Sequence, residues 1–217
     1  MFAVGLTATL VLLASVGISA QTLSLQLSDS AGNPLSGAVV LVDTGSAAAP
    51  LSAAVMDQVD MQFTPQVLVV PPATEVEFPN SDDVRHHVYS FSPAKRFELR
   101  LFKGSEAPPV LFDKPGAVVL GCNIHDRMRG YILVAEQARH AVTDAAGDVE
   151  LVDLPAGEWL VAVWHPRLQD AAPVDLGVFA AGQHGLQIAI PAEVTSAEPE
   201  LSPLQQRFRR AAGHAKD

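Results

Sequence analysis

Short strand-like segments, each closed by turn residues, recur along most of this chain. In segment 95–102 the apolar Phe97, Leu99 and Leu101 alternate with charged residues, and a period of two is typical of half-buried strands. Other such segments are TEVEFPN (74–80), VLVV (67–70), AVVL (117–120) and YILV (131–134). Sixteen prolines and fifteen glycines punctuate the chain, and no amphipathic-helix pattern precedes residue 200. The pattern predicts an all-β protein.

Two further stretches resemble the halves of a known module. Residues 23–43 contain GNPLSGAVV and residues 143–166 begin with TDAAG. Both patterns are similar to those of the carboxypeptidase-regulatory-like (transthyretin-like) β-sandwich, and the VWHP segment with Trp164 and His165 also fits that module's own pattern. The resemblance implies a discontinuous, smaller Ig/transthyretin-like sandwich formed by residues 21–55 and 136–192, with residues 56–135 inserted between its halves. The alternative is two unrelated β segments flanking the middle.

The two ends of the chain read differently from its body. Residues 1–20 carry no charged side chain and are almost wholly apolar, which predicts a signal peptide and export to a bacterial periplasm. A permanent membrane anchor is the less favoured alternative. No later stretch reaches the roughly 18–20 apolar residues of a spanning helix, so no membrane span is expected after cleavage. Residues 193–217 are rich in Ala, Glu, Pro and Ser and are expected to be a disordered tail.

Cys122 is the only cysteine. In an exported protein an unpaired cysteine indicates an intermolecular bond, a reactive thiol or a metal ligand, and a buried, unliganded thiol is the simplest alternative. His125 and Met128 follow it in GCNIHDRMRG. Thiolate, imidazole and thioether form a soft ligand set that suits copper when a second histidine joins them. Either His86 or His87 can supply that histidine. The net charge of −10 argues against a nucleic-acid partner.

With these residues in place, the middle of the chain resembles a cupredoxin (blue copper protein). The short C-x-x-H-x-x-M-R-G loop is similar to that of amicyanin, and Phe78, Asn80 and Val88 stand at the family's spacing around His86. The resemblance implies a Greek-key cupredoxin β-sandwich over residues 56–135 that holds one type 1 copper ion. The ligands carried over by position are His86, Cys122, His125 and Met128.

The chain also departs from the family pattern. His87 stands where the family usually has an asparagine that ties the ligand loops together, and it is a rival ligand. Neighbouring side chains on a strand face opposite ways, so only one of the pair can reach the metal, and His86 is favoured. Asp126 follows His125 where amicyanin has a proline, which places a charge beside this ligand. Met128 as plain core packing is the alternative to an axial ligand.

The resemblance implies an electron carrier rather than an enzyme, because four protein ligands leave no position for a substrate. Its redox partners would be a dehydrogenase or a c-type cytochrome in a methylamine-utilisation-type pathway. Two alternatives stay open. One is a copper enzyme in which His87 or water replaces Met128 and leaves an open coordination position. The other is a carbohydrate- or copper-binding module without a redox-carrier role.

Overall fold

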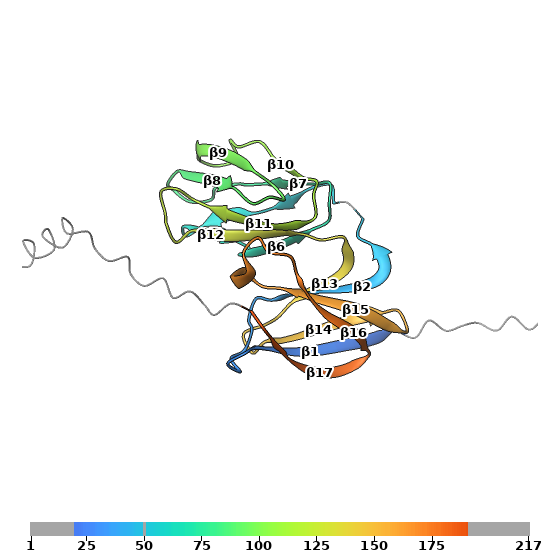
Figure 1. The fold of residues 1–217 in the computed structure, drawn as a ribbon. Helices are drawn as coiled ribbons and strands as arrows, with labels where there is room; N and C mark the ends of the chain where they lie inside the picture. The colour runs from blue at the N-terminus through green and yellow to red at the C-terminus, as the bar shows by residue number, and fades with distance from the viewer. Residues whose placement is uncertain (1–19, 50, 191–217) are drawn as a thin grey trace, which may run out of the picture.

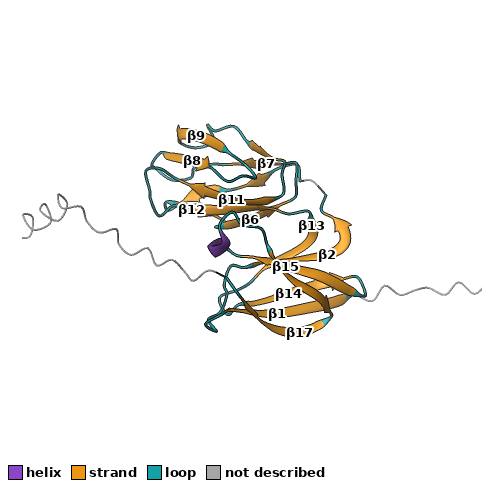
Figure 2. Ribbon diagram, viewed as in Figure 1, coloured by secondary structure: helices purple, strands orange, loops and turns teal. Residues whose placement is uncertain are grey.

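The computed structural model describes residues 20–49 and 51–190. Within them the regular structure is β, apart from the single 3-10 turn η1 (Pro166–Leu168), as Figure 2 shows. The prediction of an all-β protein is confirmed. The expected signal peptide, except Ala20, and the expected disordered tail lie outside the described residues. No helix in the described ranges is long and apolar enough to cross a membrane.

The first group of strands comes from the two ends of the described chain and is called the outer sandwich (Figure 1). One of its sheets has the order β14 (Asp148–Leu154), β1 (Gln21–Asp29), β17 (Gly182–Ile188). The other has the order β13 (Gln137–Val142), β2 (Val39–Ala47), β15 (Glu158–Trp164), β16 (Val174–Ala180). A buried cluster between them includes Leu23, Leu25, Leu27, Val40, Val42, Val161 and Val163.

The second group comes from the middle of the chain and is called the inserted sandwich. Its larger sheet has the order β6 (Val67–Val70), β12 (Arg129–Val134), β11 (Gly116–Gly121), β8 (His86–Ser90), β9 (Phe97–Phe102). A smaller sheet has the order β10 (Val110–Phe112), β7 (Thr74–Glu77), β3 (Ala54–Val55), and β4 (Asp57–Val59) pairs with β5 (Gln62–Thr64). β3 pairs with β7 although it precedes residue 56. Phe78, Phe102, Phe112, Ile132 and Val134 belong to the core of this sandwich.

The chain leaves and re-enters the outer sandwich at one place. Ala47 at the end of β2 is the register partner of Gln137 at the start of β13, and paired antiparallel Cα atoms lie about 4.5–5.5 Å apart. The inserted sandwich therefore joins the outer one where a short hairpin turn would otherwise connect β2 to β13.

The two sandwiches share a buried apolar layer, which is called the junction cluster. It comprises Val39, Leu41, Ala117, Tyr131, Leu133, Ala135 and Trp164. On β2, Val40 and Val42 face the outer core while Val39 and Leu41 face the junction. On β12, Ile132 faces the inserted core and Leu133 the junction. Both faces of each strand are buried, which explains why these strands read as continuous apolar runs.

One expectation about a strand face is wrong. Leu101 was expected on the half-buried face of its strand with Phe97 and Leu99, but its side chain is 49% exposed whereas Phe102 is buried. The pairing of β8 with β9 explains the change, because His86 pairs with Phe102 and Val88 with Leu99. β9 thus carries one extra residue between these pairs, and such a bulge reverses the alternation of side chains beyond it.

Candidate metal centre

Three strands bring the predicted ligands together at one end of the inserted sandwich. His86 opens β8, Cys122 directly follows β11, and Met128 directly precedes β12. β11 and β12 are antiparallel, with Gly121 opposite Arg129, so residues 122–128 form the loop between them. Gly121 also pairs with Tyr89 of β8. The loop and the start of β8 are therefore held side by side by sheet hydrogen bonding.

Bulky rings fix the base of this loop against glycine backbone. A Cβ atom added at Gly121 would lie 2.8 Å from Cζ of Tyr89, and one added at Gly130 would lie 2.6 Å from Cβ of Phe63. Both separations are far inside van der Waals contact, so any side chain at these positions would displace the ring. The two glycines allow Tyr89 and Phe63 to pack directly on the strands that enter and leave the loop.

Two imidazoles flank the only thiol. The Sγ atom of Cys122 lies 3.9 Å from Nδ1 of His86 and 3.8 Å from Nδ1 of His125. One ligand atom from each of the three residues lies within 4.8 Å of the others. Metal–nitrogen and metal–sulfur bonds of about 2.0–2.3 Å, as found for zinc, place the donors of a trigonal site roughly 3.5–3.8 Å apart. The spacing of these donors therefore fits a single metal ion.

His86 presents a lone pair to this cluster because its other nitrogen is occupied. Its side chain is fully buried, and Nε2 lies 2.7 Å from Oδ2 of Asp82. A carboxylate accepts hydrogen bonds, so Nε2 carries the proton and Nδ1 faces the sulfur as a ligand atom. Carboxylates that hold a ligating histidine in this way are a common support of metal sites.

Asp82 is itself held by backbone donors. Its Oδ1 accepts from Asp60 N at 2.7 Å, and its Oδ2 accepts from Met61 N at 2.9 Å. Partial burial works against the charged form, but the hydrogen bonds from Met61 and His86 outweigh it and keep the pKa of Asp82 below its usual value. The carboxylate that orients His86 is therefore ionised at neutral pH.

Cys122 and Met128 lie inside the core. Cys122 is 4% exposed and Met128 is 1% exposed, and both belong to the same buried cluster. The backbone N–H of Met128 donates to the carbonyl of His125 at 2.9 Å, which tightens the loop. His125 is only half-buried, so it is the most accessible of the predicted ligands.

His87 faces away from the other predicted ligands, as the alternation of a strand requires. Its Nε2 lies 2.9 Å from Oε1 of Glu98, and its ring packs on Tyr89 with centroids 5.5 Å apart. The hydrogen bond from His87 is the main reason why the pKa of Glu98 lies below its usual value. The structure brings His86, rather than His87, to Cys122 and His125.

Asn80 and Asp126 occupy contrasting places. The Nδ2 of buried Asn80 donates to the carbonyls of Val84 and Phe102 at 2.9 and 3.0 Å, and its Oδ1 accepts from Asp82 N at 3.0 Å. Asn80 therefore shapes the loop that presents Asp82. Asp126 is exposed beside His125.

Three residues that shape the centre, Asp82, Tyr89 and Phe63, were not predicted from the sequence. Their only visible signals were an acidic residue four positions before His86 and two rings among many apolar residues.

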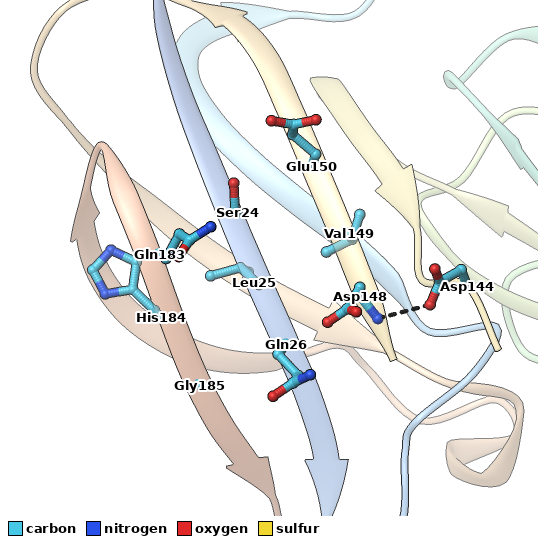
Figure 3. A pocket seen from close by; sticks show the side chains of 10 residues that line it. All are labelled: Ser24, Leu25, Gln26, Asp144, Asp148, Val149, Glu150, Gln183, His184 and Gly185. Carbon is cyan, nitrogen blue, oxygen red and sulfur yellow. Dashed lines mark hydrogen bonds between the residues drawn. The ribbon is translucent and has the colours of Figure 1, made fainter. Parts of the chain in front are cut away.

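A separate cavity of about 640 Å³ lies in the outer sandwich, bordered by β1, β14 and β17 (Figure 3). Asp144, Asp148 and Glu150 contribute to its lining. Asp144 Oδ1 already accepts from Ala146 N and Asp148 N at 2.8 and 2.9 Å, which commits it to the turn before β14. This lining offers no donor set comparable to the one around Cys122.

No protein-family model and no curated protein matches this chain. Among solved structures, a copper-containing nitrite reductase from Thermus scotoductus shares 31% identity over 41% of this chain and 23% of its own, with a TM-score of 0.37. The chain thus spans about a quarter of that enzyme.

Two smaller proteins are also similar to part of the chain. The reduced form of an amicyanin variant shares 23% identity over 40% of this chain and 92% of its own, with a TM-score of 0.35. A purple cupredoxin from Nitrosopumilus maritimus shares 19% identity over 39% of this chain and 100% of its own, with a TM-score of 0.34. All three scores are below 0.5, so the assignment of the centre depends on its own geometry.

Proposed function

We propose that the chain is a type 1 copper protein that carries single electrons between protein partners. The observation that supports this is the buried sulfur of Cys122 flanked by Nδ1 of His86 and Nδ1 of His125 at metal-binding separations. Two nitrogens and one thiolate are the equatorial set of electron-transfer copper sites, with a weak thioether as the usual fourth ligand. Copper bound there would supply one-electron chemistry between Cu(I) and Cu(II).

The residues around the cluster have separable roles in this proposal. Burial of Cys122 keeps water from the sulfur, and the hydrogen bond from His86 to Asp82 fixes one nitrogen ligand. Met128, which is buried in the core, would be the fourth residue to hold the metal. His125 is the half-buried ligand, so its edge is where a partner can approach closely. We place the chain in the periplasm, with a dehydrogenase or a c-type cytochrome of a methylamine-utilisation-type pathway as its partners.

The first test is the visible spectrum of the protein with Cu(II). An intense thiolate-to-copper charge-transfer band is expected, and Cys122→Ser should abolish it. His86→Ala should also abolish the band, whereas the matched variant His87→Ala should retain it, because His87 faces Glu98. A colourless wild-type complex contradicts a type 1 site. Loss of the band in His87→Ala alone would show that the wrong histidine of the pair has been assigned.

The second test separates a carrier from a copper enzyme with an open coordination position. If Met128 closes the site, azide should bind the oxidised wild type weakly and should bind Met128→Ala more tightly. The spectral change on azide titration measures both affinities. Tight binding to the wild type would favour the enzyme.

A further inference from the structure

A second cavity, of about 590 Å³, lies where the two sandwiches meet. Gln66, Arg129 and Tyr131 line it from the inserted sandwich, and His165, Arg167 and Gln169 line it from the outer one. The η1 turn (Pro166–Leu168) that carries Arg167 lies between the two sandwiches in Figure 2. Pockets for small molecules have volumes of about 300–1,000 Å³ and often form at such boundaries.

Arg167 is held in place from several directions. His165 Nε2 donates to the carbonyl of Ser36 at 3.0 Å, and its Nδ1 accepts from the backbone N–H of Arg167 at 3.1 Å. Both terminal nitrogens of the Arg167 guanidinium lie 3.3 Å from Oδ2 of Asp29. The guanidinium is therefore fixed where Arg167 lines the cavity.

Arg129 brings an uncompensated positive charge to the same cavity. It is exposed, and its side chain makes no hydrogen bond or ion pair within the described part of the chain. None of the residues that line the cavity is acidic. The charge stands out because the whole chain has a net charge of −10. Guanidinium groups bind carboxylate and phosphate groups through paired hydrogen bonds.

We propose that this junction cavity binds a small molecule through a carboxylate or phosphate group. Arg129 supplies the exposed charge, Arg167 lines the cavity from the outer sandwich with its guanidinium anchored on Asp29, and Gln66 borders the same space. The volume limits the ligand to a small metabolite rather than a chain segment or a macromolecule. Because both sandwiches contribute residues, the site exists only when they are packed together. It is independent of the copper function.

The test is isothermal titration calorimetry, in which the full chain is titrated with inorganic phosphate and, separately, with succinate. Saturable one-site binding of either probe is expected, and the stronger probe identifies the group recognised. Arg129→Gln should weaken binding about ten- to a hundredfold, since it removes a charge-assisted hydrogen bond. Arg127→Gln is the matched control, because Arg127 is also exposed, two residues away, but does not line the cavity.

A second variant tests Arg167. Arg167→Lys keeps a cation near Asp29 but removes the planar guanidinium from the lining of the cavity, so weaker binding is expected. The proposal fails if neither probe binds saturably. It also fails if Arg127→Gln weakens binding as much as Arg129→Gln, because that result would mean general attraction of anions.

Discussion

Among single residues, Asp82 is the one that orients His86 in the candidate metal centre. Its carboxylate accepts hydrogen bonds from the backbone N–H groups of Asp60 and Met61 and from Nε2 of His86. Asp82 thereby connects the buried His86 to the turn between β4 and β5. The order and spacing of His86, Cys122, His125 and Met128 could be predicted from the sequence, because the loop is local and the family pattern is short. The role of Asp82 could not be predicted, because nothing in the sequence distinguishes it from its neighbour Asp83. In the structure Asp83 instead pairs with Lys103 at the surface.

Asp82→Asn should weaken Cu(II) binding about ten- to a hundredfold, the usual effect of losing the group that supports a ligating histidine. The amide keeps the size of the side chain but loses the charge that fixes the proton on Nε2 of His86. Competition with a chelator of known affinity measures the change.

Asp83→Asn is the control for that measurement, and it should bind copper as the wild type does. Equal affinities for the two variants would show that Asp82 does not support the site.

At the scale of elements, the strand pattern predicted most of the inserted sandwich but not its irregularities. VLVV coincides with β6 (Val67–Val70), and the apolar core of β12 (Arg129–Val134) was also visible. The bulge in β9 was not, because an extra residue in one strand is defined only by its partner. The tight turn between β4 and β5 could not be predicted either. Asp60 and Met61 adopt φ angles of 53° and 58°, which usually require glycine, and neither residue is a glycine.

Met61→Gly should raise the free energy of unfolding by about 1 kcal/mol, because a left-handed conformation is unfavourable for any residue with a Cβ. The side chain of Met61 is 49% exposed, so little packing is lost. Urea denaturation measures the change. Gln62→Gly, at the next exposed position inside β5, should instead lower stability by about 0.5–1 kcal/mol. A lower midpoint for Met61→Gly would contradict the argument from strain.

Asp29, the last residue of β1, is expected to make the stability of the fold depend on pH. Hydrogen bonds from the backbone of Asn33, from its side chain and from Ala31, together with Arg167, lower the pKa of Asp29 despite desolvation. A carboxyl whose folded pKa lies below its unfolded value, about 3.9, stabilises the fold above that value. This contribution is lost as pH falls through the folded pKa.

Asp29→Asn should therefore be less stable than the wild type at neutral pH, and the difference should shrink below about pH 4. Urea midpoints measured from pH 7 to pH 2 test this. A difference that stays constant across that range would show that ionisation of Asp29 is not involved.

At the scale of the whole molecule, the junction cluster joins the two sandwiches. The sequence suggested an insertion but could not show that its two units bury a common layer, because the residues that meet there are far apart in the chain. Trp164 is fully buried in that layer, and its ring meets the ring of Tyr131 with centroids 5.5 Å apart.

Trp164→Ala should lower the free energy of unfolding by about 3–5 kcal/mol, as expected for a large ring removed from a core. Leu160→Ala, on the same strand but 52% exposed, should change it by less than about 0.5 kcal/mol. Circular dichroism during urea denaturation measures both. A small loss in Trp164→Ala would mean that the two sandwiches are not stabilised by their contact.

The pairing of Ala47 with Gln137 has a consequence for the order of events during synthesis. β1 and β2 leave the ribosome before the inserted sandwich, whereas their partners β13 to β17 leave after it. Domains generally fold as units as they emerge, so we expect the inserted sandwich to form first. β1 and β2 cannot pair until their partner strands have also emerged. Once formed, the inserted sandwich holds the ends of β2 and β13 close together and replaces a long loop closure by a hairpin-like one. The inserted sandwich would then serve as the turn between β2 and β13, around which the rest of the outer sandwich folds.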